Sequence, residues 1–285
     1  MSTSRYHGAM DVIEAHAARL PAVDHRWVPR PFERAELEAA LLEGGVAGIV
    51  SHPLENVRRH VRELLEGDPD KQLGMTGLGG FTEAEVLALI GELAGSALDP
   101  GAADGPVEVD PARVLDACEE AGERLALACR RGETLVLATG HPVGLALLYL
   151  EVGRLVAAHG ARPIRPADGA RWREPGLHRT WRIRYLDHVA MLTDRASARH
   201  THAPDAMHRI LAEARPDLVF ADHGFAGAAI EAGIETIGVA DVNDPALVVA
   251  RALGRTRTVI VMDDNVAPDA YWPCFQAIAG RVLGW

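Results

Sequence analysis

The second half of the chain alternates short apolar runs with amphipathic segments. The apolar runs are TLVLATG, ARPIRPADG, DLVFADHG, ETIGVADVND and RTVIVMDDN, and each is bounded by polar residues or glycine. Continuous apolar runs of this kind are typical of strands buried on both faces of a parallel sheet. Helical patterns such as VGLALLYLEVGRLVAAHG and PALVVARALG lie between them. The alternation predicts a doubly wound, mostly parallel, Rossmann-like α/β domain over residues 108–285.

Residues 1–107 show a helical pattern instead. Apolar residues recur three and four apart in AELEAALLEGG, ENVRRHVRELLEG and EAEVLALIGELAG, and each segment ends at glycine. No strand-like run stands out, so we expect a helical N-terminal region. The stretch SALDPGAADGPVEVD predicts a linker and places the boundary near residue 108. Within the second part, WRIRYLDHVAMLTD predicts a hairpin near residues 178–194, inserted over the sheet.

Composition narrows the classes of function. The formal net charge of −11 argues against binding to nucleic acid or to anionic membranes, because both require basic surfaces. No apolar run reaches the roughly 18 residues of a membrane helix, and His, Asp and Glu occupy the N-terminal segment, so a cytoplasmic protein is expected. The apolar tail YWPCFQAIAGRVLGW has two open roles, closing the sheet or forming a contact in a homo-oligomer.

Polar side chains follow the predicted strands where each strand ends. They are His141, Asp222, His223, Asp241, Asn243, Asp244, Asp263, Asp264 and Asn265. Ligands of open parallel sheets bind beyond the carboxyl ends of the strands. Carboxylates gathered there repel one another, and a cation relieves that repulsion. Oxygen ligands with Asn favour Mg²⁺ or Mn²⁺, while imidazoles would also admit Fe²⁺ or Zn²⁺. The sequence predicts a divalent-metal site, with Mg²⁺ or Mn²⁺ expected.

Other residues near the strand ends have less specific patterns. Asp244 precedes Pro245, as a helix N-cap does, and is interpreted as a cap. His200 and His202 point the same way if their segment is extended, which suits either a metal pair or acid–base chemistry. In the alternative interpretation, His200 and His202 are two exposed imidazoles in a loop. Gly140 lies between a strand and a helix, where free amide groups can hold a phosphate. Its alternative is a glycine needed only for the turn.

One basic segment stands out against the acidic background. RWREPGLHRTWRIR carries five arginines interleaved with Trp172 and Trp181. Arginine offers a planar fork to phosphate or carboxylate, so Arg171 or Arg173 could clamp an anionic substrate above the site. A solvated hairpin or a subunit contact is the alternative for this segment.

The strings ATGHPVGL, HTHAPDAM, DLVFADHGFAGAAIEAG, ADVNDPALVVA and MDDNVAPDAYWPC resemble an actinobacterial family labelled broadly as phosphatases, over roughly residues 108–275. That resemblance implies hydrolysis of phosphate esters without defining a substrate. The segment from IEAGIETIGVADVNDPA to VIVMDDN also resembles the pattern of ribosomal protein S2, which implies a fold and no ribosomal role. A helical part before an α/β part is similar in plan to the metal-dependent damage-control phosphatases, whose motif strings are not matched.

These observations lead to the hypothesis of a divalent-metal-dependent phosphatase acting on a small phosphorylated metabolite. The expected metal ligands are Asp222, Asp241, Asp264 and His200; the expected catalytic residues are His202, His223 and Asp263; the expected substrate-binding residues are Gly140, His141, Arg171, Arg173, Asn243 and Asn265. A lyase, isomerase or other hydrolase using the same cluster is one alternative. A non-catalytic binder of a nucleotide or sugar phosphate is the other.

Overall fold

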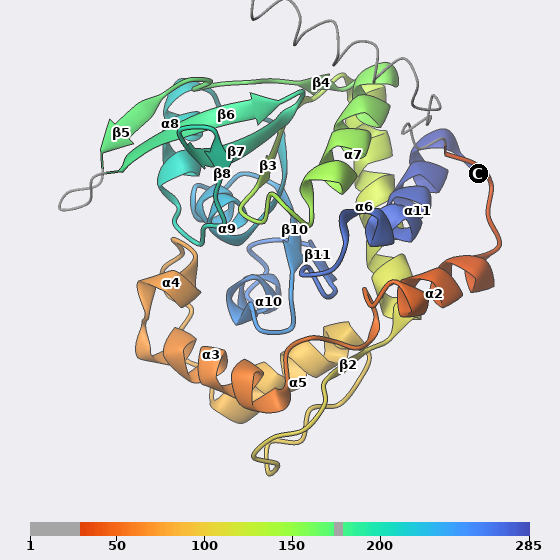
Figure 1. Cartoon of the computed structure of the whole chain (residues 1–285), viewed down its shortest axis with the longest axis vertical. Coiled ribbons are helices and arrows are strands. Elements are labelled where there is room, and N and C mark those ends of the chain that lie inside the picture. The colour runs from red at the N-terminus through yellow and green to blue at the C-terminus, as the bar shows by residue number, and fades with distance from the viewer. Residues whose placement is uncertain (1–28, 174–178) are drawn as a thin grey trace, which may run out of the picture.

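The apolar runs between residues 134 and 261 form the core of a mainly parallel sheet (Figure 1) in the computed structural model, which describes residues 29–173 and 179–285. The principal strands are β3 (Thr134–Thr139), β5 (Arg171–Arg173), β6 (Thr180–Leu186), β7 (Val189–Asp194), β9 (Leu218–Asp222), β10 (Thr236–Ala240) and β11 (Thr258–Val261). Their order is β11-β10-β9-β3-β7-β6-β5. From β11 to β7 neighbouring strands run parallel, and β6 and β5 are antiparallel additions.

Helices cover both faces of this sheet (Figure 1). The helices are α6 (Pro111–Arg131), α7 (Ala146–Ala158), α8 (Asp205–Glu213), α9 (His223–Glu231), α10 (Pro245–Ala252) and α11 (Trp272–Leu283). On one face α11 packs on α6 and α7, and on the other α9 packs on α8 and α10. The short helix η1 (Pro268–Tyr271) leads into α11. Cys274 to Gly280 are buried, so the apolar C-terminal tail closes one face of the sheet.

The chain changes direction across the sheet at β3. It passes from β3 to β4 (Arg162–Pro163) and β7 on one side, and then returns to β9 on the other side. Such a switch point is where open parallel sheets form their ligand crevice. The predicted mainly parallel α/β architecture is therefore confirmed. The antiparallel β6 and β5 set the sheet apart from the six-strand Rossmann arrangement.

Two strand predictions need correction. The run ARPIRPADG contributes only the two residues of β4, because proline at positions 163 and 166 offers no N–H to a ladder. The hairpin of β6 and β7, with Leu186 opposite Val189, does not lie over the sheet, since β7 is itself paired with β3. The two-residue β8 (Ser197–Ala198) pairs with the outer end of β7.

The N-terminal part packs directly on the sheet domain. Its elements are α2 (Arg34–Glu43), β1 (Gly48–Ile49), α3 (Leu54–Glu66), α4 (Pro69–Gln72) and α5 (Glu83–Ala94). Residues 29–107 of this part are mainly helical, but β1 pairs with β2 (Glu108–Val109), a strand too short to leave a pattern in the sequence. Helix α5 contacts α10, α2 contacts α6, and one buried apolar cluster runs through both parts. The domain boundary near residue 108 stays a prediction.

None of the helices in the described ranges is both long and apolar enough to span a bilayer.

Candidate metal centre

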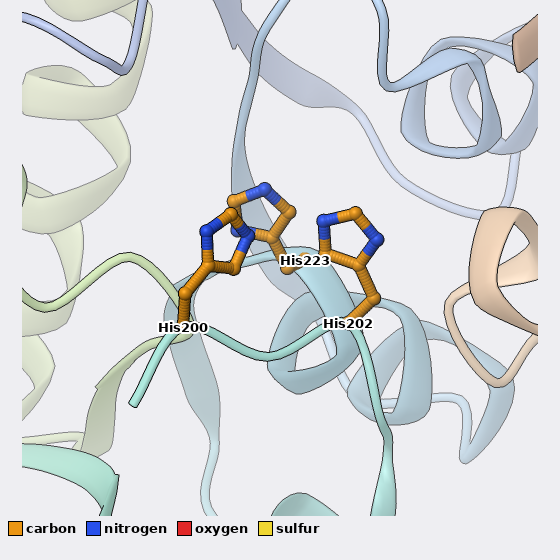
Figure 2. A group of neighbouring side chains, drawn as sticks. All are labelled: His200, His202 and His223. Carbon is orange, nitrogen blue, oxygen red and sulfur yellow. The ribbon is translucent and has the colours of Figure 1, made fainter. Parts of the chain in front are cut away.

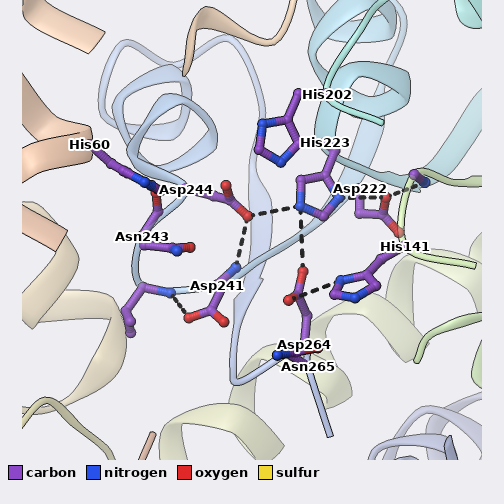
Figure 3. A network of polar contacts seen from close by, with 12 residues as sticks. His60, His141, His202, Asp222, His223, Asp241, Asn243, Asp244, Asp264 and Asn265 are labelled. Atoms are coloured by element: carbon purple, nitrogen blue, oxygen red, sulfur yellow. Dashed lines mark hydrogen bonds and ion pairs between the residues drawn. The ribbon is translucent and has the colours of Figure 1, made fainter. Parts of the chain in front are cut away.

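Imidazoles and carboxylates meet at the carboxyl ends of β3, β9, β10 and β11 (Figure 3). The cluster comprises His141, His200, His202, Asp222, His223, Asp241, Asp244 and Asp264. Two groups in it have ligand atoms that all lie within 4.8 Å of one another. They are His200, His202 and His223 in one group, and His141, His223 and Asp264 in the other.

Asp222 at the end of β9 is a fully buried carboxylate saturated by protein donors. Its Oδ2 accepts a hydrogen bond from the Thr139 hydroxyl at 2.6 Å, and its Oδ1 accepts one from the Gly140 amide at 2.5 Å. Oδ1 also lies 3.0 Å from Nδ1 of His223. Both oxygens therefore already have protein donors, so Asp222 is positioned to orient its neighbours, and its expected role as a metal ligand stays a prediction.

His223 is the central residue of the cluster. It has a positive φ of 44°, a strained conformation for a residue with a side chain, and it begins α9. With Nδ1 at Asp222, its Nε2 lies 3.2 Å from Oδ2 of Asp244 and 3.6 Å from Oδ2 of Asp264. Burial favours the neutral ring, but Asp244 and then Asp222 outweigh it and raise the pKa of His223 well above its ordinary value. This arrangement matches a metal-binding histidine held from behind by a carboxylate.

In each of two buried carboxylates of the cluster, one oxygen lacks a hydrogen-bond donor among the described residues. Oδ2 of Asp264 and Oδ2 of Asp241 are both buried without a hydrogen bond, in side chains that are 5% and 1% exposed. Oδ1 of Asp264 lies 3.1 Å from Nδ1 of His141, without hydrogen-bond alignment. Burial first, and then Asp264 and other carboxylates, raise the pKa of Asp241 well above its ordinary value. Such groups call for a proton or a cation nearby.

The histidines of the HxH segment turn toward His223, as Figure 2 shows. The ring of His202 stacks on that of His223 at a centroid distance of 4.7 Å and an angle of 12°, and the ring of His200 lies 5.0 Å from each. Nδ1 of His202 contacts Oδ2 of Asp70 on α4 at 3.0 Å. Partial burial, together with the neighbouring imidazoles, lowers the pKa of His200 to about 4. The two histidines are thus part of the cluster.

Glycines allow this loop to approach the strand ends. A Cβ atom on Gly140 would lie 2.5 Å from the carbonyl oxygen of Thr201, and one on Gly224 would collide with the carbonyl oxygen of His202. Gly140 is therefore required for close approach. Its N–H is donated to Asp222, and the N–H of His141 is donated to the Thr139 hydroxyl at 2.9 Å. The amides of Gly140 and His141 therefore already have acceptors within the protein, and the expected binding of phosphate at this turn stays a prediction.

Asp263, expected to be catalytic, ties two loops together. Its Oδ2 accepts a hydrogen bond from the Ser51 amide at 2.7 Å, and its Oδ1 accepts one from the Asn265 amide at 2.9 Å. Both oxygens of Asp263 therefore hold backbone amides, and its expected catalytic role stays a prediction. Asn265 itself is exposed beside Asp264, and no side-chain contact fixes its expected role in substrate binding.

Asn243 and Asp244 make contacts that differ from the roles expected of them. The side chain of Asn243 donates to Oδ1 of Asn56 at 3.0 Å, and the backbone carbonyl of Asn243 contacts Nδ1 of His60 at 2.8 Å, so Asn243 links the two parts of the chain, and its expected contact with substrate stays a prediction. Asp244 occupies the N-cap position of α10, but its side chain makes no capping hydrogen bond. It turns to His223 instead, and this ion pair lowers the pKa of Asp244 despite its burial.

The N-terminal part supplies contacts that sequence patterns did not indicate. Nε2 of His52 lies 3.5 Å from Oδ2 of Asp241. His60 contacts Asn243, and Asp70 contacts His202. None of these residues follows a recognisable strand. Thr139 could have been noticed, since it is the last residue of an apolar run and immediately precedes the Gly140 turn.

The two arginines expected to clamp the substrate, Arg171 and Arg173, lie in different places. Arg173 lines a cavity of about 770 Å³ that also touches His200 and His202, whereas Arg171 is exposed and does not line it. Arg173 therefore remains a candidate for contact with substrate.

Comparison with known proteins agrees with the motif strings. The model of a family described as Phosphatase matches residues 32–283. The chain is 34% identical over 252 residues to Phosphatase SCO2771 of Streptomyces coelicolor, an alignment covering 86% of this chain and 94% of that protein. The match includes the N-terminal part, beyond the span of the expected resemblance, and the likeness to ribosomal protein S2 finds no support. The chain belongs to the Phosphatase family.

Proposed function

We propose that the protein hydrolyses a small phosphorylated metabolite with the help of a divalent transition-metal ion held by His141, His223 and Asp264. Family membership supports phosphatase chemistry. The observation that carries the metal is the buried Oδ2 of Asp264, which has no hydrogen-bond donor in the described chain and lies among imidazole nitrogens.

The spacing of these donors fits a metal ion. Two ligands about 2.1 Å from one ion at a tetrahedral angle are separated by roughly 3.4 Å. Here Oδ1 of Asp264 lies 3.1 Å from Nδ1 of His141, Oδ2 of Asp264 lies 3.6 Å from Nε2 of His223, and one ligand atom from each of the three residues lies within 4.8 Å of the others. A donor set rich in imidazole suits Mn²⁺, Fe²⁺ or Zn²⁺ better than Mg²⁺, which prefers oxygen. Of the two metals expected from the sequence, the geometry favours Mn²⁺.

Each residue of the cluster has a defined task in this proposal. A bound ion would neutralise phosphoryl oxygens and activate the attacking water. Asp222 holds Nδ1 of His223, which keeps Nε2 directed at the centre. Asp241 lies close enough to the centre to contribute negative charge. His202 faces the cavity with Nδ1 at Asp70, so its Nε2 is placed to donate a proton to the leaving oxygen.

Removal of metal should abolish turnover. After dialysis against a chelator, we expect hydrolysis of p-nitrophenyl phosphate to fall at least about 100-fold, because the charge compensation of the phosphoryl group is lost. Mn²⁺ or Zn²⁺ should restore the rate better than Mg²⁺ at equal concentration. Elemental analysis of the dialysed protein provides the control. Full activity in protein shown to contain no metal would contradict the proposal.

The metal-free protein should lose stability as the pH rises above about 6.5. His223 has a raised pKa in the folded state, so its contribution to stability is complete below the unfolded pKa and disappears as the pH rises through the folded pKa. The raised pKa of Asp241 acts in the same direction. Melting temperatures between about pH 6.5 and 8.5 should therefore fall in chelator, and Mn²⁺ should reduce that fall. A flat profile in chelator would refute this assignment.

A further inference from the structure

A cavity extends from the histidine cluster toward the antiparallel edge of the sheet. It has a volume of about 770 Å³ and lies among β5, β6, α8 and the His200 to Ala206 segment. Cavities of a few hundred to about 1,000 Å³ are typical of small-molecule sites. A phosphate group alone would leave most of this space empty, so the cavity has room for the rest of a substrate.

Three arginines give the cavity a positive lining in an acidic protein. Arg173, Arg179 and Arg209 line it, and none of them forms an ion pair with a carboxylate of the described residues. Of the two lining carboxylates, Asp70 is already paired with Lys71 and His202. Because the chain carries a net charge of −11, this concentration of unpaired positive charge calls for an anionic ligand.

Two tryptophans hold arginines in place within this lining. Trp172 and Trp181 lie opposite each other in the β5–β6 ladder. The Arg209 guanidinium carbon lies 4.4 Å from the centre of the Trp172 ring, and that of Arg179 lies 5.7 Å from the Trp181 ring. Stacking fixes the plane of a guanidinium while its N–H groups stay free to bind a carboxylate or phosphate. The arginines are therefore preorganised for an anion.

We propose that this cavity binds a second anionic group of the substrate, a phosphate or a carboxylate, while the scissile phosphate lies at the histidine cluster. The inference rests on the proposed function and adds the substrate class: phosphomonoesters that carry another negative charge. His200 and His202 belong to both places, since they line the cavity and take part in the cluster.

The test compares matched substrates. Fructose 1,6-bisphosphate and fructose 6-phosphate differ by a phosphate, and 3-phosphoglycerate and glycerol 3-phosphate differ by a carboxylate. We expect kcat/KM to be about tenfold or more higher for the member with the second anionic group in at least one pair, as expected for a charged hydrogen-bonded contact. Which pair responds shows whether the second group is phosphate or carboxylate.

Two variants test whether the cavity causes the preference for a second anionic group. Arg209→Ala and Arg179→Ala should each remove most of that preference while leaving kcat/KM for p-nitrophenyl phosphate within about threefold. Arg184→Ala is the matched control, because it removes the same charge from the exposed side of β6 outside the cavity, and it should keep the preference. Equal preference in all variants, or no preference in the unmodified protein, would overturn the inference.

Binding separates this inference from the proposed function. In chelator, calorimetry should still detect binding of the preferred substrate with its second anionic group, and Arg209→Ala should weaken that binding at least about tenfold. If no phosphate ester is hydrolysed but this binding persists, the phosphatase proposal fails and the anion site stands. If hydrolysis proceeds without any arginine-dependent binding or preference, the anion site fails and the phosphatase proposal stands.

Discussion

Asp264→Asn should lower kcat/KM for phosphate esters on the order of 1,000-fold, because it removes the carboxylate that His141 and His223 share. The same change should leave the metal-free protein at least as stable as before. Asp264 raises the pKa of buried Asp241, so its neutralisation relieves repulsion between the two. Kinetics, calorimetry with Mn²⁺ and thermal unfolding in chelator measure the three effects.

The variant Asp263→Asn, at the neighbouring position, is the control for Asp264→Asn. Both oxygens of Asp263 accept backbone amides, from Ser51 and Asn265, and an amide nitrogen cannot accept. This variant should lower the free energy of unfolding by about 1–3 kcal/mol and should bind Mn²⁺ more tightly than Asp264→Asn does. The proposed ligand set would be wrong if Asp264→Asn retained both Mn²⁺ affinity and turnover.

Asp222→Asn should be the most destabilising conservative change in the cluster, with a loss of about 3 kcal/mol in the free energy of unfolding. Asp222 is fully buried, and Thr139, Gly140 and His223 all contact its carboxylate. Turnover in the folded fraction should fall about 10–100-fold, since Nδ1 of His223 loses its charged partner. Denaturation by urea and steady-state kinetics measure the two losses.

Asp217→Asn is its matched control. Asp217 accepts hydrogen bonds from the Thr134 amide and hydroxyl, so it joins the other end of β9 to β3 as Asp222 joins the end near the cluster. Asp217 is exposed, and its replacement should change the free energy of unfolding by less than about 1 kcal/mol and leave turnover unaltered. Equal losses in the two variants would show that burial of Asp222 has no special importance.

The apolar runs sufficed to predict the sheet because a strand buried on both faces must be apolar throughout. The runs that became β3, β9, β10 and β11 all show this property. Elements of two or three residues, such as β1, β4 and β5, bury too few side chains to leave a pattern. Their pairing depends on strands distant in the sequence.

The sequence predicted where the candidate site lies, but it predicted the roles of its residues only in part. The rule that parallel strands end at one edge predicted that His141, Asp222, His223, Asp241 and Asp264 would lie near one another. It could not show how each carboxylate turns. Asp222 faces strand-end donors, while Asp244, interpreted as a cap, faces His223. Each carboxylate turns toward the nearest donor, and that donor comes from an element distant in the sequence.

The amino-acid sequence alone determined the chemistry available and the edge of the sheet where it gathers, because residue type and apolar periodicity are local properties. Only the tertiary structure decided which side chains remain free for a ligand. Within residues 29–173 and 179–285, Asp264 Oδ2 lacks a donor whereas Asp222 has three, and three arginines without an ion pair meet in one cavity, from β5, from α8 and from the residue before β6. Hydrogen bonds and ion pairs between residues far apart in the chain fix these differences, so no local pattern contains them.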